Sequence, residues 1–136
     1  MDSHRARGLP PETVARLHMW LADRIASRVR VRDMAAVACM SEFHFHRQFR
    51  LATGESPHAF LTRLRMEQAQ RLLRHSDMPL RELSRALGYR PAHFCLVFRR
   101  FSGTTPMAYR RRCQHEAQGE PPYAVPGPVS DSPRAG

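Results

Sequence analysis

An internal repeat constrains this chain more than any other feature of its sequence. When the 136-residue sequence is shifted by 49 residues, its two halves align without a gap. Apolar, glycine and capping positions then coincide in the same order, which indicates two copies of one supersecondary unit. The matching pairs are residues 31–34 with 80–83, His44-Phe45 with His93-Phe94, Phe49-Arg50 with Phe98-Arg99, Gly54 with Gly103, Ser56-Pro57 with Thr105-Pro106, Ala59 with Ala108, Phe60 with Tyr109, and Arg63 with Arg112.

Each copy predicts a short helix, a tight turn and a second helix. Ser41 is a good N-cap for the second helix of the first copy, and Gly54 is a left-handed stop after it. Phe45 and Phe49 are spaced to lie on its buried face. Two helices joined by a turn of three to four residues form the helix-turn-helix pattern. The expected helices cover residues 31–38 and 42–52 in the first copy and 80–87 and 91–102 in the second.

Three further helices are expected, over residues 11–27, 57–74 and 106–113. No stretch shows the alternation of a strand, so the predicted fold is all-α, with about seven helices. The expected order is a disordered start (1–9), a first helix-turn-helix subdomain (10–55), a connecting helix (56–75), a second subdomain (76–113) and a disordered, proline-rich tail (114–136).

The charge of the chain indicates a polyanionic partner. All 22 basic residues are arginine, against 12 acidic residues, for a formal net charge of +10. Residues 1–113 hold 21 arginines and nine acidic residues, whereas residues 114–136 hold one arginine and three acidic residues. A folded region with a net charge of +12 attracts polyanions, and nucleic acid is the first candidate.

Several classes of protein are excluded by the same sequence. No apolar run is long enough to span a membrane, and residues 1–9 lack the apolar segment of a secretory signal. Three cysteines do not make a disulfide framework, so reduced thiols in the cytoplasm are expected. His44 and His46 do not share a helix face, and no nucleophile or acid–base constellation is present. We therefore expect no metal, no cofactor and no enzymatic activity.

A set of motifs between residues 12 and 113 is specific in combination, although each motif alone is weak. Together they resemble the DNA-binding domain of the AraC family of bacterial transcription regulators. The residues that carry this resemblance are the segment 40–49, Gly54, Pro57, Arg63-Leu64-Arg65, Ala69, Leu72-Leu73, Leu87-Gly88-Tyr89, His93-Phe94, Phe98-Arg99-Arg100, Gly103-Thr104-Thr105-Pro106 and Tyr109-Arg110.

The resemblance implies a sequence-specific transcriptional regulator, in this case an activator. In that family a long helix holds two recognition helices, which enter successive major grooves on one face of double-stranded DNA. Most family members carry a second, effector-binding or dimerising domain, for which this chain has no room. The sequence therefore resembles the stand-alone members, and we expect it to bind DNA as a monomer in the bacterial cytoplasm, associated with the nucleoid.

The resemblance also assigns candidate DNA contacts. The base-contacting positions of the family match Phe43, His46 and Arg47 in the first copy, and the second copy offers Ala92, Cys95 and Leu96. Arg47 can donate two hydrogen bonds to guanine, and Phe43 can touch a thymine methyl group. In the second copy the segment 88–94 is one residue shorter than in the family, and Leu96 replaces a usual arginine. The expected phosphate contacts are Ser41, Arg50, Arg63, Arg90, Arg99, Arg100, Arg110 and Arg112.

Two alternative functions remain open from the sequence. The first is a protein-interaction module of the same fold, whose partner would be RNA polymerase or another regulator. The second is a basic protein that binds DNA without sequence preference. Discrimination between DNA sequences separates the leading interpretation from both, because a non-specific binder has equal, salt-sensitive affinity for all DNA.

Overall fold

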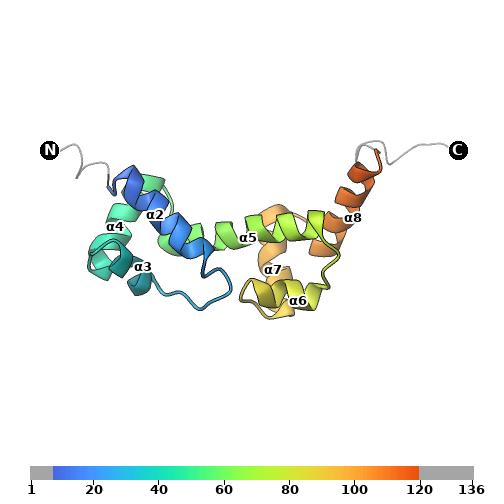
Figure 1. Cartoon of the computed structure of the whole chain (residues 1–136), viewed down its shortest axis with the longest axis horizontal. Helices are drawn as coiled ribbons and strands as arrows, with labels where there is room; N and C mark the ends of the chain where they lie inside the picture. The colour runs from blue at the N-terminus through green and yellow to red at the C-terminus, as the bar shows by residue number, and fades with distance from the viewer. Residues whose placement is uncertain (1–7, 120–136) are drawn as a thin grey trace, which may run out of the picture.

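The structure is a computed structural model that describes residues 8–119, and this part of the chain is built from helices without a strand. A long helix, α5, runs through the middle, with α2, α3 and α4 at one end and α6, α7 and α8 at the other (Figure 1). The predicted all-α fold is confirmed. The helices are α2 (Pro11–Ala22), α3 (Val31–Val37), α4 (Glu42–Thr53), α5 (Pro57–His75), α6 (Leu80–Ala86), α7 (Pro91–Ser102) and α8 (Pro106–Ala117).

The sequence repeat reappears in the ends of the helices. The bounds of α6 and α7 are those of α3 and α4 shifted by 49 residues. Both α4 and α7 stop at a glycine, Gly54 and Gly103, each with a left-handed φ of 82°. The next helix then begins with a hydroxyl cap: the side chains of Ser56 and Thr105 accept hydrogen bonds from backbone N–H groups three residues ahead, at 3.1 and 3.2 Å. Each such cap contributes about 1 kcal/mol.

Helix α5 takes part in two separate hydrophobic cores. Its first half contributes Leu61 and Leu64 to a core shared with α2, α3 and α4. Its second half contributes Met66 and Ala69 to a core shared with α6, α7 and α8. The 19 residues of α5 span about 28 Å, so one rigid element separates the two helix-turn-helix units.

The two cores repeat the same aromatic packing. The rings of Phe45 and Phe49 lie 5.5 Å apart in the first core, and those of Phe94 and Phe98 lie 5.6 Å apart in the second. All four side chains are fully buried. A third ring meets each pair edge-on, that of Phe60 in the first core and its repeat equivalent, Tyr109, in the second. Edge-to-face contacts of this kind add to the free energy of burial.

The structure departs from the expected boundaries at three places. Helix α2 ends at Ala22, five residues before the expected end, and turns follow it. Leu9 was expected in a disordered start, but its side chain is buried in the first core and its N–H donates to the Gln48 carbonyl. Helix α8 extends to Ala117, into the segment expected to be disordered. Residues 1–7 of the predicted start and residues 120–136 of the predicted tail lie outside the described part of the chain.

Within residues 8–119, no helix combines the length and the apolar character that crossing a membrane requires.

Candidate nucleic-acid interface

The turn between α3 and α4 positions the first candidate recognition helix. Cys39 lies in this turn with a positive φ of 59°, and Ser41 caps α4 by accepting a hydrogen bond from the N–H of His44 at 3.2 Å. The matching turn between α6 and α7 places Gly88, with a φ of 85°, at the position of Cys39. The two turns therefore have the same length, and they direct α4 and α7 in the same way from their own cores.

Helix α4 has one buried face and one free face. Phe45 and Phe49 are buried, whereas Phe43, His46 and Arg47 are all exposed. Phe43 is 79% exposed, so this large ring contributes almost nothing to the core of the domain. An aromatic side chain left in solvent between exposed histidine and arginine side chains suits contact with base edges, since thymine offers a methyl group and guanine offers two acceptors.

The equivalent face of α7 is apolar and partly covered. Ala92 is exposed, Cys95 is half-buried, and the side chain of Leu96 is 50% exposed. None of the three carries a strong hydrogen-bond donor or acceptor. The surface that α7 offers is therefore suited to van der Waals contact rather than to hydrogen-bonded discrimination between bases.

Exposed arginines lie close to both free faces. Arg50 is exposed on α4, while Arg90 is the N-cap residue of α7 and Arg99 and Arg100 are in its last turn. For these four side chains, no ion pair or hydrogen bond is recorded within residues 8–119, so their charges are available to an anion. Arg112 on α8 is also exposed, with its guanidinium 5.5 Å from the centre of the Tyr109 ring.

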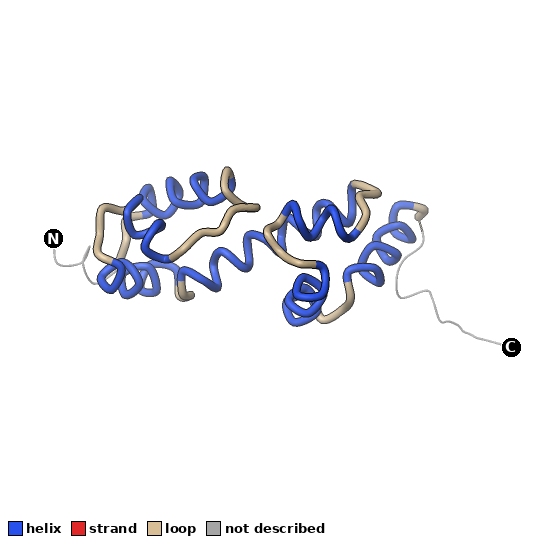
Figure 2. The backbone as a smooth tube through the Cα atoms, turned by 90° about the horizontal axis from the view of Figure 1, so that it is seen from below, coloured by secondary structure: helices blue, strands red, loops and turns tan. Residues whose placement is uncertain are grey.

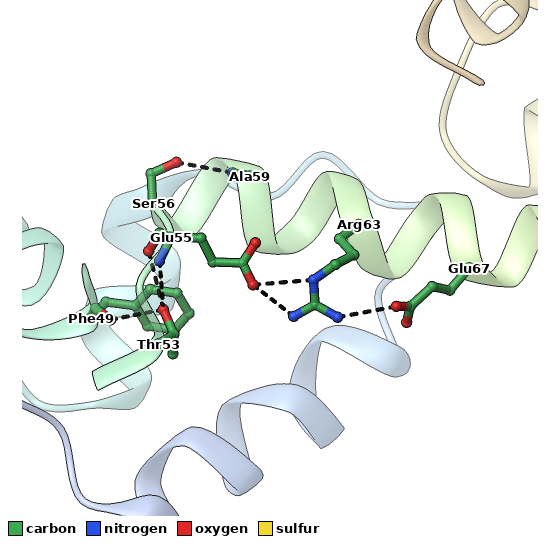
Figure 3. A network of polar contacts seen from close by, with 7 residues as sticks. All are labelled: Phe49, Thr53, Glu55, Ser56, Ala59, Arg63 and Glu67. Carbon is green, nitrogen blue, oxygen red and sulfur yellow. Dashed lines mark hydrogen bonds and ion pairs between the residues drawn. The ribbon is translucent and has the colours of Figure 1, made fainter. Parts of the chain in front are cut away.

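Two arginines that were expected to contact phosphate, Arg63 and Arg110, make contacts within the protein. Arg63 lies between two carboxylates, with 2.7 Å from Nη2 to Glu55 and 3.1 Å from Nη1 to Glu67 (Figure 3). The hydrogen bond to Glu55 raises the pKa of Arg63 and ties the α4–α5 junction to α5. Arg110 is only 7% exposed, and its Nε donates to the Leu73 carbonyl in the last turn of α5 at 3.2 Å. Both side chains therefore have partners within the protein: Arg63 is partly exposed and paired with two carboxylates, and Arg110 is buried.

Two further positions have structural roles that the sequence-based predictions did not include. Cys39 is exposed, and its backbone adopts a left-handed conformation in the turn. Its match with Gly88 in the 49-residue repeat was the available signal. Arg65 on α5 donates to the carbonyl oxygens of Ile25 and Ser27 at 3.0 and 2.7 Å. No local pattern points to this contact, because its partners lie some 40 residues away.

The comparisons with known proteins agree with this geometry. A family model described as a helix-turn-helix domain matches residues 34–112. The MmsAB operon regulatory protein of Pseudomonas aeruginosa is 31% identical over 105 residues, which cover 76% of this chain and 33% of that protein. The transcriptional activator RhaS of Escherichia fergusonii is 36% identical over 93 residues, covering 68% and 34%. The chain thus spans about a third of the length of the curated relatives it matches.

Solved structures show the same arrangement of helices. The DNA-binding domain of the global transcriptional factor AdpA, solved in complex with a target DNA, is 34% identical and has a TM-score of 0.70, covering 78% of this chain and 95% of that one. The fold is also shared, at 20% identity and a TM-score of 0.70, by a regulator from Chromobacterium violaceum described as AraC-type, covering 85% and 96%.

Proposed function

Because the chain belongs to the AraC-type family of helix-turn-helix DNA-binding transcription regulators, we propose that it binds one asymmetric DNA site with both units. In this proposal α4 and α7 enter successive major grooves on one face of the duplex. The observation that carries it is the pair of free helix faces, at repeat-equivalent positions, on the two units that α5 joins. Successive major grooves on one face lie about 34 Å apart, a separation that a connecting helix about 28 Å long suits.

The first unit supplies base specificity in this proposal. Arg47 donates to the O6 and N7 atoms of a guanine, His46 forms a hydrogen bond with a neighbouring base, and Phe43 packs on a thymine methyl group. Each good contact of this kind discriminates against a wrong base by about 1–3 kcal/mol. The exposure of all three side chains on one stretch of α4 supports this assignment.

The second unit supplies affinity. Arg90, Arg99 and Arg100 carry charges that no carboxylate neutralises in the described part of the chain, and Arg112 lies one helix further on. Phosphate contacts from these side chains position the protein without reading the sequence. In the first unit, Arg50 and the hydroxyl of Ser41 serve the same purpose. The Ser41 hydroxyl oxygen accepts the capping hydrogen bond from the N–H of His44, and its own proton can donate a hydrogen bond to a phosphate.

Regulation of transcription follows in this proposal from site-specific binding in the bacterial cytoplasm. Several relatives are transcriptional activators by name, so we propose that the bound protein activates a promoter, with RNA polymerase as its second partner. The exposed Leu96 on α7 favours one alternative, in which α7 binds a protein and only α4 contacts DNA.

The test is a selection from randomised duplex DNA with the purified chain, followed by footprinting and measurement of stoichiometry on the selected site. We expect one chain to protect two adjacent major grooves of a non-palindromic site. Equal affinity for selected and random DNA would overturn sequence-specific binding. Protection of a single groove would favour the alternative in which α7 contacts a protein.

A further inference from the structure

The loop between α2 and α3 breaks the symmetry of the repeat. Eight residues, 23–30, separate Ala22 from Val31, whereas only four separate the end of α5 from the start of α6. The longer loop extends from the first unit toward the turn between α6 and α7, and both views of the backbone show the two segments side by side (Figures 1 and 2). The first unit thus touches the second through this loop as well as through α5.

Arg65 holds the loop in this position. It lies on α5 between Leu64, which belongs to the first core, and Met66, which belongs to the second. Its Nε donates to the Ile25 carbonyl at 3.0 Å, and its Nη2 donates to the Ser27 carbonyl at 2.7 Å. A planar guanidinium can donate to both carbonyls at once from a fixed geometry, which an ammonium group cannot reproduce.

The other side of this contact belongs to the second unit. The Arg65 guanidinium lies 5.5 Å from the centre of the Tyr89 ring, one residue before the N-cap of α7. At Gly88, an added Cβ would come within 3.1 Å of the Ala26 carbonyl oxygen and 3.5 Å of Arg65 Nη2. Loop, arginine and turn are therefore closely packed. Ile25 reinforces the contact, because its side chain packs against both hydrophobic cores.

We propose that Arg65 and loop 23–30 form a brace that fixes the orientation of α7 relative to α4. This inference rests on the proposed function: if both helices enter DNA, the brace sets the separation of the two half-sites that the protein accepts. Arg65 is then a positioning residue, since its donors point at protein carbonyls. A one-base-pair change in spacing moves a half-site by about 3.4 Å and turns it by about 35°. A rigid pair of units cannot follow this displacement.

The variants are Arg65→Ala, which removes the brace, and Arg65→Lys, which keeps the charge and loses the paired geometry. The matched control is Arg71→Ala. Arg71 lies on the same helix, but among residues 8–119 its guanidinium donates to Gln68 alone, within α5, at 2.9 and 2.6 Å. Circular dichroism and thermal unfolding identify the variants that fold, and Arg65→Lys serves as the test should Arg65→Ala unfold.

The first measurement needs no DNA. Nitroxide labels on Arg50→Cys and Arg99→Cys, in a background with Cys39→Ser and Cys95→Ser, report the distance between α4 and α7. We expect one narrow distance distribution in the otherwise unchanged chain and in Arg71→Ala, and a broader distribution in both Arg65 variants. An unchanged distribution in Arg65→Lys would overturn the brace, whether or not the protein binds DNA as proposed.

The second measurement compares affinity for the selected site with affinity for sites one base pair longer or shorter between the halves. We expect the affinity of the unmodified chain and of Arg71→Ala to fall at least about tenfold on the altered sites, a factor typical of one wrong base pair. The Arg65 variants should bind the selected site more weakly than the unmodified chain does. Their affinity should fall much less when the spacing between the half-sites is altered. If the substitution of Arg65 lowers the affinity by the same factor at every spacing, Arg65 contacts a phosphate and does not set the spacing.

Discussion

Cys39 and Gly88 occupy the same position in the two turns, and both have a left-handed backbone, with φ of 59° and 85°. Glycine adopts this conformation freely, whereas a side chain with a Cβ is strained there by about 1–2 kcal/mol. The first unit thus carries in its turn a backbone strain that the second unit avoids. Because the Cys39 side chain is exposed, its burial contributes little to offset that strain.

Replacing this cysteine by the residue of the other turn is expected to stabilise the protein. Cys39→Gly should raise the free energy of unfolding by about 0.5–1 kcal/mol, since the relieved strain exceeds the extra entropy that glycine gives the unfolded chain. Urea unfolding measures the change. Cys39→Ala is the control, because it removes the thiol and keeps the Cβ, so its stability should stay near that of the original chain. Equal stabilisation by both substitutions would assign the effect to the thiol.

The left-handed backbone of Cys39 could have been predicted from the sequence, because the repeat aligns this residue with Gly88, which ends a helix. The repeat likewise predicted the starts of α3, α4, α6 and α7, since caps, prolines and glycines are local signals. Local signals also placed Phe45 and Phe94 in the cores.

Contacts between segments that are far apart in the sequence could not be predicted from it. A helix was expected up to residue 27, but α2 ends at Ala22. Arg65 on α5 instead donates hydrogen bonds to the carbonyl oxygens of Ile25 and Ser27. At the level of the sequence, Arg63, Arg99 and Arg110 all had the same predicted role, contact with a DNA phosphate. Only tertiary structure shows that Arg63 meets two carboxylates and that Arg110 is buried. The candidate base contacts stay predictions.

The separate roles of the arginines give the next prediction. Arg99→Ala should weaken binding to all DNA sequences by a similar factor and reduce the slope of log affinity against log salt by about 1, because one phosphate contact is lost. Arg63→Ala removes the same charge from a side chain already paired with Glu55 and Glu67. It should lower the stability by up to about 1 kcal/mol, because the paired side chains are partly exposed, and change the salt slope far less.

Titrations at four salt concentrations, with thermal unfolding of both variants, distinguish the two arginines. A salt slope that falls equally in both would mean that Arg63 leaves its carboxylates and contacts a phosphate on DNA. A slope unchanged in Arg99→Ala would remove Arg99 from the proposed interface.

Arg47 is expected to carry specificity. Arg47→Ala should weaken binding to the selected site by about 1–3 kcal/mol and to random DNA by much less, because the lost hydrogen bonds are to one guanine. Arg50→Ala, on the same helix, is the comparison, and it should weaken binding to both DNAs alike. Competition assays with selected and random duplexes measure the two ratios. If Arg47→Ala lowers the affinity for both duplexes equally, Arg47 contacts the DNA backbone.

The last prediction concerns unequal specificity of the two half-sites. The first unit offers Phe43, His46 and Arg47 on an exposed face, and the second offers Ala92, Cys95 and Leu96 in a partly covered one. Discrimination between bases comes mainly from hydrogen bonds to their edges, and the second set has almost none to give. Its exposed arginines are proposed to contact phosphates, which are present at every DNA sequence.

A motif selected from random DNA should therefore show sharp positions in one half-site and, one helical turn away, a diffuse second half with a preference for thymine, whose methyl group suits Leu96. The substitution Leu96→Arg restores a donor at the position that Arg47 holds in the first unit, and it should sharpen a guanine preference in the second half. Leu96→Met, which keeps an apolar side chain, is the control. Two half-sites of equal information content in the original chain would contradict this prediction, and would indicate that Arg90 or His93 enters the groove instead.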